Sequence, residues 1–302
     1  MTPLVSICVP LYNKVAYIER TLRALLAQTY PHLEIVVLDN ACTDGSTEIV
    51  HQQMIDGRIR CHRLSYTISQ NESWRYCMQL ARGEFVNLHR PPDTTLPPDF
   101  VEKMVAPLLA DASIGFSVCD AKIVPAPGFD ERATDVMVNV HRFIAEYAKD
   151  LTATPSRRER AAKLLPLSLE NRVGTPYTAL VRRSALPWEH WKKTASYWPE
   201  SYADWDFMLR LYLIHRGVWV DDTHMDYHLD ESMGYWKVVS GSDPRLMLHD
   251  KMYRLMMPIT LLCDPELAEL RSVGSIRAGS ELVNAAMQRL YEAMTLAQTV
   301  ET

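Results

Sequence analysis

Short apolar runs mark the first part of the chain. Residues 5–9 and 34–38 are rich in β-branched residues and predict buried strands, and residues 60–64 and 85–88 look like further strands. Helical periodicity separates them, as where Ile18, Leu22 and Leu25 share one face of residues 16–28, or across residues 74–81. This alternation predicts an α/β fold: a Rossmann-like, mainly parallel sheet built from right-handed βαβ units and flanked by helices.

The later part of the chain is patterned for helices. Residues 204–214 place Phe207 and Leu211 toward a core at helical spacing. Residues 244–263 and 265–296 carry leucine and methionine at similar intervals. We expect these last two segments to form a C-terminal helical extension that covers the preceding domain or makes a homodimer contact.

Composition narrows the class of protein. The 302 residues carry 32 Lys+Arg against 37 Asp+Glu, a formal net charge of -5, and 47% are hydrophobic, as in a globular enzyme. The acidic balance argues against a nucleic-acid partner, which would require a basic field. The six cysteines show no C-x-x-C spacing, so we expect free thiols in a reducing compartment.

These features predict a cytoplasmic protein without a transmembrane segment. The N-terminal residues lack the basic stretch and long apolar run of a signal peptide, and the longest apolar segments are too short to span a bilayer. A basic patch at residues 155–163 suits peripheral contact with anionic lipid at the inner face of a membrane, although a solvated helix face is the simpler and preferred explanation.

Candidate ligand-binding residues follow the first two predicted strands. Pro10, Tyr12 and Asn13 come after one strand, and Asp39 ends the other. Ligands bind parallel α/β sheets at the carboxyl ends of strands, where the strand order reverses. A ring, an amide and a carboxylate suit a nucleobase there, but they also suit an ordinary turn or helix cap. Neither G-x-G-x-x-G nor a P-loop is present.

Several segments, taken in order, resemble family 2 glycosyltransferases with the GT-A fold. The first is SICVPLYNKVAYIERTLRALLAQTYPHLEIVVLDNACTDGS, and the later ones are LARGEFV, LPPDF, DWDFMLRL and YHLDES. The resemblance covers about residues 4–232. It implies a nucleotide-sugar-binding half at residues 1–100 and an acceptor-binding half at residues 101–235, followed by the helical extension at residues 236–302.

The resemblance also implies roles for individual residues. Asp39 would contact the base of the nucleotide, and the pocket around it would be lined by Pro10, Tyr12, Asn13 and Asn71. Asp204 would be the general base that deprotonates the acceptor hydroxyl. A carboxylate at the start of a helix is equally explained as an N-cap.

The family's metal motif is degraded in this sequence. Members carry a D-x-D-like cluster after the strand that corresponds to residues 85–88, because hard divalent cations prefer oxygen ligands. Here His89 and Pro91 stand at the acidic positions, or Asp93 and Thr95 if the loop is longer. Asp93 is the one carboxylate left at these positions. The expected cofactor is a divalent cation, Mn²⁺ or Mg²⁺, but the degraded motif leaves its binding open.

Three consequences of this departure stay open. In the first, Asp93 and Asp230 hold the cation, and Asp230 stands at the position of the family's late histidine. Alternatively Arg90 binds the diphosphate directly, since a guanidinium contacts phosphate in a bidentate way, with His89 and His228 on the diphosphate or acceptor side. Finally, transfer activity is lost and binding alone remains.

The function that the resemblance implies is an inverting sugar transfer. The donor is a nucleotide diphosphate sugar, UDP-linked, and the acceptor is a hydroxyl group of a glycan or glycolipid. The alternative is a catalytically inactive module that binds nucleotide sugar or glycan on the same fold. A nucleotidyltransferase is disfavoured because residues 11–14 lack that class's glycine- and basic-rich loop.

Overall fold

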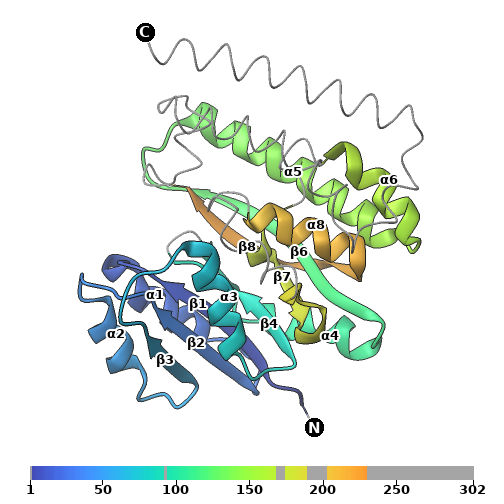
Figure 1. The fold of residues 1–302 in the computed structure, drawn as a ribbon. Helices are drawn as coiled ribbons and strands as arrows, with labels where there is room; N and C mark the ends of the chain where they lie inside the picture. Colours follow the sequence, from blue (N-terminus) through green and yellow to red (C-terminus); the bar gives the residue numbers. More distant parts are fainter. Residues whose placement is uncertain (1, 92–93, 168–173, 189–202, 230–302) are drawn as a thin grey trace.

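The computed structural model describes residues 2–91, 94–167, 174–188 and 203–229. They form one eight-stranded sheet in the order β3-β2-β1-β4-β7-β6-β8-β5, with helices packed against its faces (Figure 1). The predicted α/β architecture is therefore confirmed, although the sheet as a whole is mixed rather than parallel throughout.

The first half of the sheet is parallel. β1 (Val5–Leu11) pairs with β2 (Leu33–Asp39) on one side and β4 (Phe85–Leu88) on the other, and β2 pairs with β3 (Ile59–Arg63). Every residue of β2 is buried, as expected for a strand whose two faces are both covered. These are the four strands that the sequence pattern predicted at residues 5–9, 34–38, 60–64 and 85–88.

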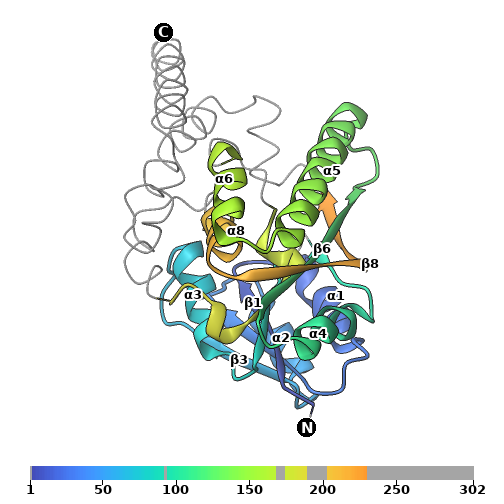
Figure 2. The same ribbon diagram turned by 90° about the vertical axis from the view of Figure 1, so that its right-hand side faces the viewer.

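The strand order reverses between β1 and β4. α1 (Val15–Leu26) and α2 (Ser46–Gln53) lead the chain from β1 to β2 and on to β3, and α3 (Gln70–Leu80) returns it to β4 on the other side of β1. Right-handed crossovers then place α1 and α3 on opposite faces of the sheet, as Figure 2 shows. The connections diverge at the carboxyl ends of β1 and β4, which creates a crevice.

Pro10 lies inside β1, although the pattern predicted that the strand would end there. β4 pairs with β1 only as far as Cys8, so among the described strands Pro10 has β2 alone as a neighbour. A proline cannot donate to a second strand, and this position does not require it to.

The second half of the sheet is built around two long strands. β6 (Ile114–Pro125) and β8 (Arg216–Leu229) pair in parallel, whereas β7 (Ala179–Arg182) is antiparallel to both β4 and β6, and β5 (Thr94–Thr95) is antiparallel to β8. Short 3-10 turns at Pro176–Thr178 and Arg183–Ala185 flank β7. β7 thereby joins the two halves into one sheet.

Four helices accompany the second half. They are α4 (Phe100–Ala110), α5 (Glu131–Ala153), α6 (Arg157–Leu167) and α8 (Ala203–Ile214). α5, α6 and α8 gather at the end of the molecule away from α1 and α2 (Figure 1). α8 confirms the helix predicted at residues 204–214, and its buried Trp205, Phe207 and Leu211 belong to the main core.

Two expectations concern the chain as a whole. The C-terminal extension at residues 236–302 lies outside the described residues, so the division into three parts stays a prediction. Among the helices of the described ranges, none is both long enough and apolar enough to cross a bilayer.

Candidate active site

A cavity of about 260 Å³ lies where the strand order reverses. Its lining comes from the end of β1, the residue after β2, the segment that leads into α3 and the loop after β4. Pro10, Tyr12 and Arg90, all predicted site residues, are in this lining. The volume is below the roughly 300 Å³ at which sites for drug-sized ligands begin, so it suits a base and ribose rather than a whole nucleotide sugar.

Asn40 supplies the polar end of β2 to the cavity. Its Nδ2 donates to the Ile68 carbonyl oxygen at 2.9 Å, and its Oδ1 accepts from the Ile68 N–H at 2.8 Å. These bonds fix the segment before α3 against the end of β2. An amide has a second N–H and a second lone pair, so Asn40 retains hydrogen-bonding capacity toward a ligand.

The start of α3 forms another wall. Ser69 Oγ accepts from the Glu72 N–H at 3.3 Å, and Glu72 Oε2 accepts from the Ser69 N–H at 3.2 Å, a reciprocal capping box. This cap fixes the helix start, from which Ser73 and Trp74 line the cavity. Asn71 lies on the same turn and is buried, but it is not part of the lining.

Asp39 lies behind the cavity rather than in its lining. The side chain is fully buried, Oδ1 accepts from the Cys42 N–H at 2.8 Å, and Oδ2 accepts from the Thr47 hydroxyl at 2.6 Å. Arg63 approaches Oδ2 at 3.5 Å. The carboxylate therefore holds the turn after β2 in place, and its contact with a base stays a prediction.

Asn13 ties the loops after β1 and β2 together. Its Oδ1 accepts from the Thr43 N–H at 2.9 Å, and its own N–H donates to Cys42 Sγ at 3.3 Å. Asn13 and Ala41 both have a positive φ, 48° and 58°. Asparagine tolerates this region, whereas for alanine it costs about 1 kcal/mol, so the cross-loop bonds hold a strained turn beside the cavity.

Asp204, the predicted general base, stands in the first turn of α8 and is half-buried. Its Oδ1 accepts from the Trp205 N–H at 2.7 Å. Burial raises the pKa of its carboxyl group to about 6, against the opposing effects of that bond and of the nearby Arg90 charge. Asp204 is therefore ionised near neutral pH but remains a competent proton acceptor.

The predicted diphosphate-side histidines lie next to β5. His89 is buried, with Nδ1 3.2 Å from Thr94 Oγ1, and burial together with the charge of His228 lowers its pKa to about 3. His228 Nε2 lies 3.0 Å from Thr95 Oγ1. His89 is thus a neutral, internally bonded imidazole and supplies no positive charge to a diphosphate.

Both predicted metal ligands, Asp93 and Asp230, lie outside the described residues. Within the ranges that the structure does describe, no group of three or more His, Cys, Asp and Glu side chains is arranged to hold a metal ion. The described residues alone therefore do not fit a metal centre.

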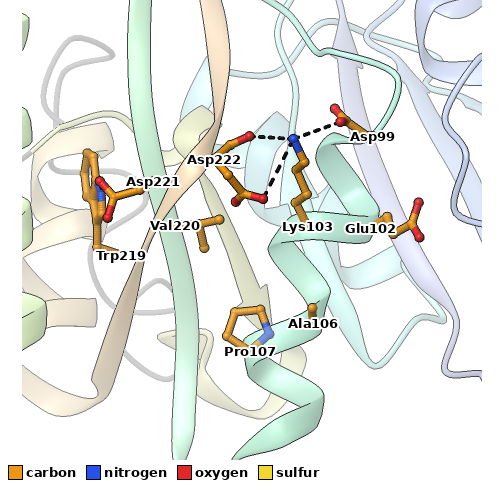
Figure 3. Close-up of a pocket in the computed structure, with 9 residues that line it drawn as sticks. All are labelled: Asp99, Glu102, Lys103, Ala106, Pro107, Trp219, Val220, Asp221 and Asp222. Atoms are coloured by element: carbon orange, nitrogen blue, oxygen red, sulfur yellow. Dashed lines mark hydrogen bonds and ion pairs between the residues drawn. The ribbon is translucent and has the colours of Figure 1, made fainter.

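A second hollow, of about 600 Å³, lies between α4 and the middle of β8. Figure 3 shows Lys103 of α4 reaching between Asp99 and Asp222. Its Nζ lies 2.9 Å from the Asp99 carboxylate and 2.5 Å from the Asp222 backbone oxygen. These charges satisfy one another away from the strand ends, so the smaller cavity is the candidate active site.

Sequence reasoning missed several residues of the cavity. Asn40 directly follows Asp39, and the pattern predicted only turn chemistry for it. Thr67, Ile68 and Trp74 also line the cavity. The S-x-x-E pattern of the capping box was available in the sequence and would have placed the start of α3, with these residues, at this edge of the sheet.

Known families and proteins show several similarities to this chain. The model of the family described as "Glycosyl transferase family 2" matches residues 6–187. The chain is also 30% identical over 83 residues to "UDP-Glc:alpha-D-GlcNAc-diphosphoundecaprenol beta-1,3-glucosyltransferase WfaP" of Escherichia coli, which is 28% of this chain and 33% of that protein. It spans only about a third of the length of the curated relatives it matches.

Two solved structures share the architecture. S. aureus TarS 1-349 in complex with UDP-GlcNAc gives a TM-score of 0.57 at 18% identity, covering 89% of this chain and 70% of that chain. Mannosyltransferase PcManGT from Pyrobaculum calidifontis in complex with GDP-Man and Mn²⁺ gives 0.54 at 18% identity, covering 98% and 83%. At these identities the likeness concerns the fold alone, and it confirms the expected GT-A-like fold.

Proposed function

The chain belongs to glycosyl transferase family 2, and on that premise we propose that it transfers a sugar from a UDP-sugar to a hydroxyl group of a glycan or glycolipid acceptor, with inversion at the anomeric carbon. One observation carries the proposal. Arg90 lines the nucleoside-sized cavity at the strand ends, and its charge also acts on the carboxyl group of Asp204.

The cavity holds the nucleoside of the donor. Tyr12 is 50% exposed, so one face of its ring is available to stack on a base. Asn40 offers hydrogen bonds from the end of β2, while Asp39 and Asn13 shape the two loops from behind. Asn71 is buried in the first turn of α3, beside the cavity. The diphosphate and sugar extend beyond the cavity on the side of Arg90.

Asp204 accepts the proton of the acceptor hydroxyl. The acceptor oxygen attacks the anomeric carbon on the face opposite the diphosphate, and a bond forms between them. The bond from the anomeric carbon to the diphosphate breaks, and its electron pair leaves with the nucleoside diphosphate. One carboxylate suffices for this direct displacement, because no covalent sugar–enzyme intermediate is formed.

The identity of the donor rests on the relatives. The name of WfaP specifies UDP-Glc and the TarS structure contains UDP-GlcNAc, which favours uridine, whereas PcManGT was solved with GDP-Man. The Mn²⁺ of PcManGT supports a divalent cation, Mn²⁺ or Mg²⁺, as cofactor. We propose Asp93 and Asp230 as its ligands; such an ion, when bound, neutralises the leaving diphosphate.

Two further parts of the proposal concern partners and location. Residues 236–302 are proposed to make a homodimer contact. A cytoplasmic location is proposed, with peripheral contact at the inner face of the membrane if the acceptor is a glycolipid.

The substitution Asp204→Asn tests the proposed function. We expect kcat/KM for transfer from a labelled UDP-sugar to fall by about 10²–10⁴-fold, because the amide cannot accept the proton. UDP affinity, measured by calorimetry, should change less than about twofold. Asp135→Asn, on the exposed face of α5, is the matched control and should behave as wild type.

Two results would argue against this mechanism. Equal losses of transfer and of UDP affinity in Asp204→Asn would remove the base assignment. UDP binding by the wild type without any transfer, over a panel of donors and acceptors, would favour the alternative of a binding module.

A further inference from the structure

The short segment between β1 and α1 contributes two side chains to the lining of the cavity, Tyr12 and Lys14. Tyr12 is 50% exposed, so packing in the core does not fix its position. α1 also begins without a local cap, because Lys14 stands at the N-cap position and its side chain makes no capping bond. The conformation of residues 12–14 therefore depends on contacts from another part of the chain.

The loop after β2, together with the first residue of α2, supplies those contacts. The Lys14 N–H donates to Ser46 Oγ at 3.0 Å, and the Val15 N–H donates to Asp44 Oδ2 at 2.9 Å. These two bonds form a loop clamp. The preceding backbone N–H, that of Asn13, also donates to the loop after β2. Three successive N–H groups are thus fixed by a segment that is distant in the sequence.

Asp44 accepts hydrogen bonds at the start of both α1 and α2. Oδ2 accepts from Val15, the first residue of α1, while Oδ1 accepts from the N–H of Ser46, the first residue of α2, at 3.0 Å and from its hydroxyl at 2.6 Å. A carboxylate is favoured there, because the first N–H groups of a helix lack partners within it and the helix dipole is positive at that end. Partial burial raises the pKa of Asp44, but the bonds from Ser46 and Val15 outweigh burial and lower it, so the carboxylate is ionised at neutral pH.

We propose that Asp44 is a positioning residue for the donor: by capping α1 and α2 together, it holds residues 12–14 in the conformation that places Tyr12 against the base. This inference rests on the proposed function. Asp44 is not in the described lining of the cavity, so it acts through these residues. Ala41, in the same loop as Asp44, has a φ of 58°, which alanine disfavours. Without the clamp the loops must be ordered when the nucleoside binds, and that cost lowers the affinity.

Asp44→Ala tests this role with uridine and UDP as probes, both titrated calorimetrically. We expect both affinities to fall by the same factor, about 3- to 30-fold, which corresponds to the loss of one helix cap. The KM for a UDP-sugar should rise by that factor. At saturating donor, kcat should stay within about twofold of wild type, because Asp44 touches no reacting atom.

Asp130→Ala is the matched control for lost stability. Asp130 caps α5, where its Oδ1 accepts from the Ala133 N–H at 2.8 Å, and α5 lies at the end of the molecule away from α1 and α2 (Figure 1). Asp44→Ala and Asp130→Ala should both lower the melting temperature by a few degrees. Asp130→Ala should nevertheless bind uridine and UDP as the wild type does.

Two further variants keep the test independent of one substitution. Ser46→Ala removes the acceptor of the Lys14 N–H, so it should weaken uridine and UDP equally through a different side chain. Asp44→Asn keeps one acceptor oxygen and should lose less affinity than Asp44→Ala.

The outcomes separate this inference from the function beneath it. If Asp44→Ala and Ser46→Ala bind uridine as tightly as Asp130→Ala does, the clamp serves stability alone, and the inference is wrong. A loss confined to UDP, or a fall in kcat with both affinities retained, would also overturn it, with the proposed function intact. A wild-type protein that binds neither probe and transfers no sugar would instead overturn the proposed function, and this inference with it.

Discussion

Asp204 and Asp206 stand two positions apart on α8, yet their surroundings give them different chemistry. Asp206 is 2% exposed and accepts from Arg210 Nε at 3.1 Å, an ion pair within one turn of the helix. Asp204 meets a backbone N–H and the more distant charge of Arg90. A buried ion pair is costly to break and serves the fold, whereas Asp204 is available to exchange a proton.

The raised pKa of Asp204 predicts the pH dependence of transfer. The base form is the active form, so kcat/KM for a UDP-sugar should be constant above about pH 7 and fall about tenfold per unit below pH 6. Because the Arg90 charge lowers this pKa, Arg90→Met should move the acid limb to higher pH. The measurement is a series of initial rates between about pH 4.5 and about pH 8.5, a range that covers both sides of the acid limb.

The control is Arg158→Met, whose acid limb should coincide with that of the wild type. An acid limb that stays in place in Arg90→Met would mean that the titrating group is not Asp204. An acid limb near pH 4 in the wild type would mean that an ordinary, solvated carboxylate controls the pH dependence of the rate.

The sequence does not show which of Asp39 and Asn40 faces the cavity. The sequence placed a polar pair at the end of a strand, and the structure confirms that location. Which of two adjacent side chains turns inward depends on the φ of 58° at Ala41 and on the bonds to Cys42 and Thr47. Such tertiary details leave no periodic pattern in a single sequence.

At the scale of elements, the arginines of α6 cap the end of α8. The last carbonyl groups of a helix have no partner within it. Arg160 Nε donates to the Tyr212 carbonyl oxygen at 2.7 Å, and Arg157 Nε donates to that of Leu213 at 3.0 Å. Two arginines of the basic patch at residues 155–163, the patch considered for lipid contact, therefore make hydrogen bonds within the protein.

Arg160→Met should destabilise the protein by about 2–3 kcal/mol, because it leaves buried carbonyl groups of α8 and of Thr154 without donors. Urea unfolding followed by circular dichroism measures this free energy. Arg158→Met, exposed on the same helix, is the control and should lie within about 0.5 kcal/mol of wild type. A loss for Arg160→Met as small as the control's would show that water replaces the guanidinium.

The elements were predictable where local patterns suffice. β1 and β2 are continuous apolar runs, and α1 carries one apolar face, so each was visible by itself. β8 escaped prediction because Asp221 and Asp222 interrupt its hydrophobic character. The strand is irregular there: Val118 pairs with Trp219, whereas Asp120 already pairs with His224.

At the scale of the whole molecule, the proposed active site joins segments that are distant in the chain. The cavity takes residues from β1, β2, α3 and the loop after β4, and α8 adds Asp204 from the second half. The parallel order of the first four strands follows from handedness rules, which made the crevice predictable. The insertion of β7 between β4 and β6 depends on long-range pairing, so it was not predictable from the sequence.

A ligand in such a cavity should stabilise the fold as a unit, which the whole protein can report. At about 100 times its dissociation constant, a nucleotide adds about 2.7 kcal/mol to the free energy of unfolding. For a chain of this size that raises the melting temperature by a few degrees. We expect UDP to do so more than GDP, CDP or dTDP at equal concentration, in a thermal-shift assay.

The same assay with Mn²⁺ and with chelator separates the sources of positive charge. If Arg90 binds the diphosphate, UDP should still stabilise the protein in chelator, and Arg90→Met should lose that shift while uridine retains its own. Stabilisation by UDP that requires Mn²⁺ in the wild type would instead assign the diphosphate to a metal held by Asp93 and Asp230. Absence of any nucleotide shift would contradict the nucleoside cavity itself, because a ligand that binds the native state must stabilise it.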